Sequence, residues 1–253
     1  MLWQLYTSLR TPEALLGGLA ALGKGWTLEN YGQVLSASPP FWRYLLNSAV
    51  VGSGSTLLTL AVAIPCAYAL ARRGGRLRLW VGAGLLAAAV FPYVLLFLAL
   101  LQLARQFGLA NNLLALCLPY AGLSLPLAVL LLQAAFTDLP PDLEDSALLE
   151  GFGLWQRLRW ILLPLLGPAL FSTALLVFLF SWNEFPIALT WLSRSDLLTL
   201  APAMARIAGS SVYTVPYGAF AAATVLGGVP LLLLLLLFQR QIVAGLTQGA
   251  IKG

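Results

Sequence analysis

The residues that could carry chemistry in this chain are few and unevenly distributed. Four of the nine carboxylates lie in the short stretch from Asp142 to Glu150, and the chain contains no histidine. The absence of histidine excludes His-centred catalytic triads, imidazole metal sites and imidazole proton relays. Cys66 and Cys117 lie in separate apolar runs, so we interpret both as buried hydrophobic residues. We therefore expect neither a catalytic residue nor a metal site.

The composition indicates a chain that lies in a lipid bilayer. Of its residues, 60% are hydrophobic and only 9% are charged, and the mean hydropathy is +0.88. A soluble chain of 253 residues needs far more polar surface to cover its core. The net charge of +5 comes mostly from scattered basic residues. We therefore expect the lipid bilayer, and no nucleic acid, as a partner.

Five apolar segments are long enough to cross a bilayer as helices, which takes roughly 20 residues each. They cover residues 44–71, 79–104, 113–136, 162–183 and 217–238. Each contains proline or glycine, which membrane bundles tolerate better than soluble helices do; the prolines include Pro65, Pro92, Pro126, Pro168 and Pro230. We expect an all-α integral membrane protein, a polytopic bundle of kinked helices that forms a single domain over residues 1–253.

Basic residues predict the orientation of the spans. One short loop is crowded with arginine, and the positive-inside rule places it in the cytoplasm; its members are Arg72, Arg73, Arg76 and Arg78. Alternation then places residues 137–161 and the tail 239–253 inside, with 105–112 and 184–216 outside. Residues 1–43 also fall outside although they carry no secretion signal. We therefore expect a first transmembrane helix that is missing from, or truncated in, this sequence.

The five predicted spans contain no aspartate, glutamate, lysine or arginine. Ion-coupled carriers generally place a titratable group at membrane depth, so the sequence disfavours a carrier driven by an ion gradient. The chain also lacks the phosphate-binding loop G-x-x-x-x-G-K-[ST], so we expect it to hydrolyse no nucleotide itself. What remains is a passive conduit, or a channel part that a partner drives.

The charged connection between the third and fourth spans has the features of a short helix. Asp138 stands at a capping position, two prolines follow, and the next turn is acidic. Gly151 predicts the end of this helix, and a second helix is expected from about Leu154 into the next span. Polar and apolar side chains alternate around the first helix, as in a helix inserted between two protein surfaces. An ordinary solvated loop with helix caps is the alternative.

The spacing of this connection resembles the EAA loop of the permease subunits of binding-protein-dependent ABC importers. Asp145, Ser146 and Ala147 stand at its E-A-A positions, followed at the family's spacing by Gly151, Ile161, Leu163 and Pro164. Asp replaces Glu and Ser replaces the first Ala. The resemblance implies a cytoplasmic coupling helix that docks on an ATPase, with nine coupling residues: Glu144, Asp145, Ser146, Ala147, Glu150, Gly151, Ile161, Leu163 and Pro164. Carboxylates among them are expected to pair with basic groups of the ATPase.

Other stretches resemble the carbohydrate branch of this family, specifically the shorter of the two maltose- or trehalose-type permeases. They are "WTLENY" (26–31), "LLNSAVV" (45–51), "AYALAR" (67–72), "WNEFPIAL" (182–189) and the terminal "RQIVAGLTQGAIKG". In such proteins the stretch "LWQLYTSLRTPE" directly follows a first transmembrane helix. The resemblance implies a permease domain of the type I ABC importer kind in a bacterial or archaeal cytoplasmic membrane.

The same resemblance implies the partners and the energy source. A second homologous permease completes the pore, and two copies of a cytoplasmic ATP-binding subunit drive it. An extracytoplasmic sugar-binding protein delivers the substrate to the outer segment 184–216, and the tail 239–253 reaches toward the ATPase. ATP and Mg²⁺ belong to the ATPase, so this chain is expected to bind no cofactor.

Four residues near membrane depth offer stacking faces or hydrogen-bonding groups for a sugar, and packing is the alternative role for each. They are Tyr93, Gln133, Trp182 and Asn183. Alternatives for the whole chain are an ABC permease for another solute, such as glycerol phosphate or a polyamine, a carrier that is not ATP-coupled, and a membrane structural or assembly protein.

Overall fold

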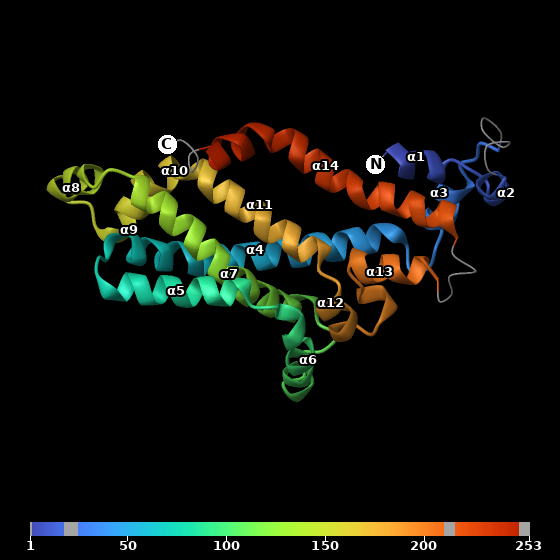
Figure 1. Cartoon of the computed structure of the whole chain (residues 1–253), viewed down its shortest axis with the longest axis horizontal. Helices are drawn as coiled ribbons and strands as arrows, with labels where there is room; N and C mark the ends of the chain where they lie inside the picture. The colour runs from blue at the N-terminus through green and yellow to red at the C-terminus, as the bar shows by residue number, and fades with distance from the viewer. Residues whose placement is uncertain (1, 18–24, 210–215, 248–253) are drawn as a thin grey trace. The chain divides into compact units, whose positions relative to one another are not determined.

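The computed structural model describes residues 2–17, 25–209 and 216–247, most of which are helical (Figure 1). Within these residues β-type pairing is limited to an isolated bridge between Arg10 and Trp26. The α-helices are α1 (Leu2–Ser8), α2 (Pro12–Leu16), α3 (Glu29–Leu35), α4 (Phe41–Arg72), α5 (Arg76–Val90), α6 (Phe97–Gln106), α7 (Leu113–Asp138), α8 (Asp142–Leu149), α9 (Leu154–Arg157), α10 (Leu163–Leu165), α11 (Gly167–Asn183), α12 (Pro186–Trp191), α13 (Leu200–Ile207) and α14 (Tyr217–Thr247). Two 3₁₀ turns, η2 (Tyr93–Leu96) and η4 (Ser195–Leu197), and one π-helical turn, η3 (Leu158–Leu162), complete the series.

Three helices are long and apolar enough to cross a membrane unbroken. They are α4, α7 and the part of α14 from Tyr217 to Gln239. Two further spans are possible if each of two bent pairs counts as one: Arg76–Val90 with Tyr93–Gln106, bent by 80°, and Leu154–Leu165 with Gly167–Asn183, bent by 82°. By length and composition the described residues thus offer three to five spans, at the five places that hydropathy predicts.

The two breaks occur at prolines. Phe91, which precedes Pro92, has an extended backbone (φ −61°, ψ 132°), because the proline ring disfavours a helical conformation in the residue before it. The second break falls just before Pro168, so the span predicted over 162–183 is corrected: its helix begins at Gly167, and the preceding residues form a separate leg. Pro65, Pro126 and Pro230, in contrast, lie inside continuous helices.

The chain forms two compact units. Unit 1 consists of residues 1–51, 96–116 and 182–237, and unit 2 consists of residues 52–95, 117–181 and 238–253.

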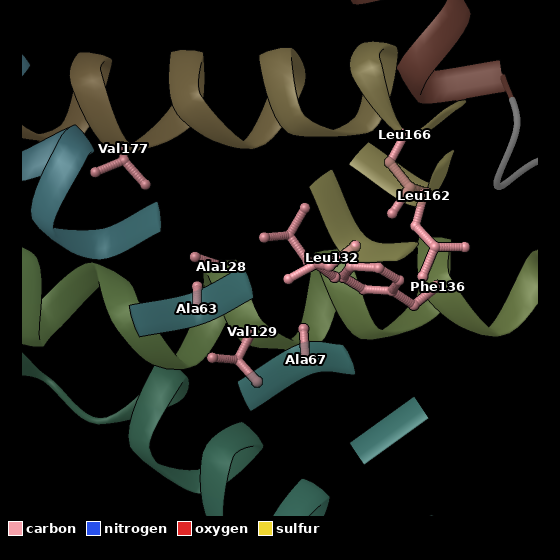
Figure 2. Close-up of a cluster of buried hydrophobic side chains, with 10 residues drawn as sticks. Ala63, Ala67, Ala128, Val129, Leu132, Phe136, Leu162, Leu166 and Val177 are labelled. Carbon is pink, nitrogen blue, oxygen red and sulfur yellow. The ribbon is translucent and has the colours of Figure 1, made fainter. Parts of the chain in front are cut away.

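The core of unit 2 is built from small and branched apolar side chains on several helices (Figure 2). Its buried members are Ala63, Ala67, Ala128, Val129, Leu132, Phe136, Leu158, Leu162, Leu166 and Val177. Glycines on α4 let neighbouring helices approach: a Cβ at Gly54 would lie 2.7 Å from Cys117 Sγ, and one at Gly52 would lie 2.8 Å from the Phe178 ring. Close packing through small residues is what associates helices in a membrane, where the solvent is itself apolar.

The two cysteines differ in burial. Cys117 is buried, as expected, but Cys66 is exposed, so the prediction that both are buried is wrong for Cys66. The reason is the orientation of α4, which turns Ala63 and Ala67 toward the core of unit 2 and Cys66 away from it.

Unit 1 holds the N-terminal segment against the beginning of α14. The Asn30 amide on α3 donates hydrogen bonds to the carbonyls of Ser8 and Arg10, each at 2.9 Å. The Arg10 guanidinium lies over two aromatic rings, 4.9 Å from the centroid of Tyr6 and 5.2 Å from that of Trp26. Such stacking stabilises a buried cation that has little access to water.

Candidate functional site

The helix with the EAA-like spacing, α8, begins after two prolines and ends at a glycine. Asp138, predicted to cap it, is instead the last residue of α7, because Leu139 precedes Pro140 and a residue before proline disfavours the helical conformation. The α8 backbone starts from Pro141, whose carbonyl accepts hydrogen bonds from Glu144 N at 2.9 Å and Asp145 N at 3.2 Å. Three acidic residues in the first turn lie near the positive end of the helix dipole.

The end of α8 is a sharp, defined turn. Gly151 has φ +83°, as predicted for the residue that stops this helix. Its N–H donates to Leu148 O and the next N–H, of Phe152, donates to Ala147 O, each at 3.0 Å. This pair of bonds is the Schellman motif, which fixes the direction in which the chain leaves the helix.

The side chains of α8 divide into a buried and an exposed set. Glu144 and Ala147 are buried. The other side chains of the predicted coupling set on this helix and its cap, Asp145, Ser146 and Glu150, are exposed. Leu149 is also exposed, at 91% of its surface, a state that is costly for a large apolar side chain in water. The exposed set is therefore acidic and apolar at once, as a protein-docking surface is.

Glu144 makes its contacts inside this chain. Its Oε2 accepts a hydrogen bond from Tyr68 Oη at 2.7 Å and lies 3.8 Å from Arg157 Nη1. Its Oε1 accepts a hydrogen bond from Arg72 Nε. Three groups of unit 2 thus surround this carboxylate, and its pairing with a basic group of a partner stays a prediction.

The connection from α8 to α11 is tightly wound. After Gly151, Gly153 N donates to Gln156 Oε1 at 2.8 Å and starts α9. Ile161 lies in η3, and Leu163 and Pro164 lie in α10. Pro164 has no N–H to donate to the carbonyl four residues earlier, and in a regular α-helix its ring would clash with that carbonyl. The helix therefore widens into the π turn just before Pro164, where Leu163 N donates to Leu158 O.

The four predicted pathway residues lie in different units. Tyr93 and Gln133 belong to unit 2, and Trp182 and Asn183 belong to unit 1. Tyr93, in η2, packs edge-on against Phe180 with ring centroids 5.4 Å apart. Gln133 Oε1 is buried and has no hydrogen-bond partner among the described residues. Trp182 is buried and Asn183 is exposed, both at the end of α11.

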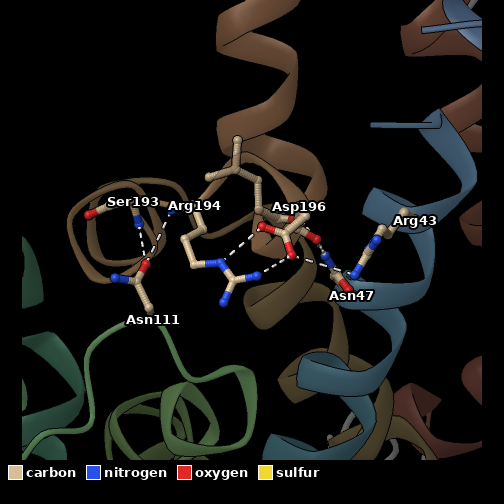
Figure 3. A network of polar contacts seen from close by, with 7 residues as sticks. Arg43, Asn47, Asn111, Ser193, Arg194 and Asp196 are labelled. Carbon is tan, nitrogen blue, oxygen red and sulfur yellow. Dashed lines mark hydrogen bonds and ion pairs between the residues drawn. The ribbon is translucent and has the colours of Figure 1, made fainter. Parts of the chain in front are cut away.

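A polar network of unit 1 fixes the loop before α13 (Figure 3). The Asp196 carboxylate binds the guanidinium of Arg194 at 2.8 Å and lies 3.5 Å from that of Arg43. The Asn47 amide donates to the carbonyls of Asp196 and Leu198, at 3.1 and 2.9 Å. The hydrogen bond from Arg194 lowers the pKa of the Asp196 carboxyl below its ordinary value. The loop thus keeps a fixed charge arrangement.

The same loop is tied to the turn between α6 and α7. Asn111 Oδ1 accepts from Ser193 N at 2.6 Å and from Arg194 N at 3.2 Å, and Asn111 N donates to Trp191 O at 2.9 Å. Asn111 has φ +57°, a left-handed conformation that asparagine tolerates better than most residues. Glu184, at the start of the segment, is buried and accepts from Ile187 N and Ala188 N at the beginning of α12.

The contacts of Glu144 and those of Asn111 were not predicted from the sequence. A signal for the Glu144 contacts was available: Tyr68 and Arg72 are four residues apart at the end of a predicted span, so they lie on one face of the helix. No comparable spacing joins Asn111 to Ser193, since six α-helices, α7 to α12, separate the two.

Comparison with known proteins identifies the family. The family described as "Binding-protein-dependent transport system inner membrane component" matches residues 60–248, which include α8 and the whole connection to α11. The chain belongs to this family. It is thus a component of a transport system and not a catalytic enzyme, and it is a multi-pass membrane protein, as predicted. Membership also implies ATPase, substrate-binding protein and second permease partners.

Relatives of this family match the whole chain. The sulfoquinovosyl glycerol transport system permease protein SmoH of Agrobacterium fabrum is 36% identical over 100% of this chain and 88% of its own length. The trehalose/maltose transport system permease protein MalG of Thermococcus litoralis is 37% identical over 100% of this chain and 90% of its own length. The trehalose transport system permease protein SugB of Mycobacterium tuberculosis is 35% identical over 100% and 92%.

A solved structure shares the fold. A chain of a bacterial ABC transporter involved in the import of the acidic polysaccharide alginate superposes with a TM-score of 0.79 over 94% of this chain and 88% of its own length, at 21% identity. The predicted fold class, a helical membrane protein of the type I ABC importer kind, is confirmed.

Proposed function

We propose that the chain is one permease subunit of an ATP-driven sugar importer and forms half of its translocation pore. The observation that carries this proposal is identity of 35–37% across the entire chain with permeases named for trehalose, maltose and sulfoquinovosyl glycerol. A fourth relative, 33% identical, is named for diacetylchitobiose uptake. These solutes are small glycosides rich in hydroxyl groups, so the substrate is an oligosaccharide or disaccharide of that kind.

The pathway residues supply the chemistry that a glycoside requires. Sugar hydroxyls need hydrogen-bonding groups, which Gln133 and Asn183 offer, and sugar ring faces stack on aromatic side chains such as Tyr93 and Trp182. The unpaired Gln133 Oε1 supports its role most directly, because a buried amide oxygen without a partner costs free energy unless a hydroxyl binds it.

The exposed face of α8 docks on the ATPase. Asp145 and Glu150 would pair with basic groups there, while Leu149 would fill an apolar cleft. Ala147, buried, holds the helix to the permease; Gly151 sets the angle between α8 and α9; Ile161, Leu163 and Pro164 stiffen the leg that carries motion to α11. ATP and Mg²⁺ bind to the ATPase, of which the complete importer has two copies. This chain supplies no ligand to either.

The sugar receptor docks on the outer segment 184–216, where the Asp196 network presents a cationic surface. Arg43 and Arg194 expose 45% and 64% of their side chains, and Arg206 Nη2 donates to Ser193 O at 3.4 Å. Two guanidiniums share the one Asp196 carboxylate, and Arg206 adds a third positive charge to the segment, so positive charge is in surplus. An acidic surface on the receptor would complement it and accelerate encounter. In this proposal residues 184–216 lie outside a bacterial or archaeal cytoplasmic membrane, and a second, homologous permease completes the pore.

Uptake measured under separate control of the two energy sources tests the proposal. Uptake of radiolabelled trehalose and of maltose is measured in cells that lack the chain, before and after the cells are complemented with it. Complementation should restore uptake of at least one of them, and that uptake should survive collapse of the proton gradient while ATP is maintained. Uptake that stops with the gradient and persists without ATP would establish an ion-driven carrier instead.

A further inference from the structure

Two residues of the "AYALAR" stretch have a role that neither the pore nor the docking surface explains. Tyr68 and Arg72 lie one helical turn apart at the end of α4, and both side chains reach the carboxylate of Glu144 on α8. They are separated from Glu144 by 76 and 72 positions in the sequence. A third group, the Arg157 guanidinium on α9, approaches the same carboxylate. One carboxylate therefore joins three helices.

This cluster is partly withdrawn from water. The side chain of Glu144 is 10% exposed, that of Arg157 is 14% exposed, and that of Arg72 is 24% exposed. Exposed ion pairs contribute little because water screens them, whereas removal of one partner from a buried pair leaves an uncompensated charge. Tyr68 adds a hydrogen bond to a charged acceptor, which is stronger than one between neutral groups. The geometry of the cluster is thus well defined.

The covalent connections of α8 lead to α7 and α9, and neither leads to α4. Three residues, Leu139 to Pro141, join it to α7, and four, Glu150 to Gly153, join it to α9. The second connection contains Gly151 in the left-handed region and a further glycine at position 153. This turn sets the angle between α8 and α9 and leads toward α11. The contacts of Glu144 bypass both connections and reach α4 directly.

We propose that Glu144 is a latch that fastens the coupling helix to α4, so that a displacement of α8 is passed to this span. Glu144 is therefore a positioning residue, and Tyr68, Arg72 and Arg157 are its hydrogen-bond and ion-pair partners. The inference rests on the proposed function, because it presumes that an ATPase moves α8. It differs from that proposal in separating docking, which uses the exposed face of α8, from transmission, which uses the buried face.

The test uses the full importer with four variants of this chain. Glu144→Gln keeps the shape of the side chain and removes its charge. Glu29→Gln makes the same change on an exposed side chain of α3, outside both the cluster and the α8 surface, and is the matched control. Leu149→Asp disrupts the docking surface. The exchange Glu144→Arg with Arg72→Glu restores an ion pair of opposite direction, in which Arg157 can also pair with the new Glu. Each variant is assayed for ATPase co-purification, ATP hydrolysis and sugar uptake.

The latch predicts an uncoupled importer. For Glu144→Gln the ATPase co-purifies as in wild type and hydrolysis stays within about twofold, but uptake falls at least tenfold. The exchange recovers at least threefold of that loss, and Glu29→Gln changes nothing. Uptake within twofold of wild type for Glu144→Gln would overturn the latch. So would loss of the ATPase from this variant, since Glu144 would then belong to the docking surface.

Two further measurements keep the outcomes distinct. If Glu144→Gln is absent from the membrane, Tyr68→Phe takes its place, because it removes one hydrogen bond of the latch; it should lower uptake about threefold with the ATPase retained, and unchanged uptake would overturn the latch. If Leu149→Asp retains the ATPase, or wild-type uptake is independent of ATP, the proposed function fails and not the latch alone.

Discussion

At the scale of single residues, glycine is required at position 151 because of the backbone conformation there, and not because a side chain would lack room. A Cβ added there would meet no atom within 4 Å, so no clash forbids a side chain. The restriction comes from φ +83°, which costs most L-residues about 1–2 kcal/mol. Glycine is therefore needed for the turn between α8 and α9, and not for packing.

This distinction predicts a graded response at Gly151. Gly151→Asn should retain most uptake, because asparagine enters the left-handed region readily, whereas Gly151→Val should lower uptake at least tenfold, because a β-branched residue resists it. Sugar uptake in complemented cells, normalised to the amount of permease in the membrane, measures the difference. Equal activity of the two variants would mean that the turn has no role in coupling.

The pKa of Asp196 predicts the pH range of the outer network. The hydrogen bond from Arg194 lowers this pKa below its ordinary value of about 4. A carboxyl whose folded pKa is depressed contributes stability above its unfolded pKa, and the contribution disappears as pH falls through the folded pKa. The difference in Tm between wild type and Asp196→Asn should thus be constant from about pH 5 to 8 and shrink below about pH 4.

Thermal unfolding of the purified permease at each pH measures that difference. A gap that narrowed between pH 8 and pH 5 would show that another titrating group controls the loop.

At the scale of helices, α4 and α7 pack through a glycine against a cysteine. Gly54→Ala places a methyl group 2.7 Å from Cys117 Sγ, and such overpacking typically costs 1–3 kcal/mol. Gly54→Ala should therefore lower the Tm of the purified permease. Addition of Cys117→Ala should recover most of the loss, because it removes the clashing sulfur. Failure of the second change to recover stability, or a first change without effect, would contradict this packing.

Helix positions could be predicted well from the sequence, since apolar length alone marks a span. Their ends could not. Asp138 looks like a cap in sequence, but Leu139 and the two prolines decide where α7 ends and α8 begins. The 80° and 82° bends also occur at prolines. Of the five prolines named in the predicted spans, however, only Pro92 and Pro168 stand at a break. Neighbouring helices decide which prolines a span can accommodate.

The candidate site was predictable in position but not in its contacts. Spacing indicated α8 and its turn at Gly151, because local backbone rules fix both. Two partners of Glu144, Tyr68 and Arg72, lie more than 70 positions earlier in the sequence. Asn111 Oδ1 accepts from two backbone N–H groups more than 80 positions later. Such long-range pairs depend on how helices pack, which hydropathy does not encode.

At the scale of the whole molecule, the chain has the organisation of a passive permease driven from outside. No predicted span contains aspartate, glutamate, lysine or arginine, the chain lacks a phosphate-binding loop, and its family is that of inner membrane components of binding-protein-dependent transport. Energy must therefore enter through a surface. The exposed, acidic and apolar face of α8 is the surface that the account assigns to this task.

The most direct test of that assignment is the amount of ATPase that co-purifies with the importer when Leu149 is replaced by Asp. The replacement puts a charge at a side chain that is 91% exposed in the chain alone, so the permease should fold and reach the membrane normally. The ATPase should be lost and sugar uptake should fall to background, while the second permease stays bound. An ATPase retained in full, with uptake unchanged, would contradict that assignment.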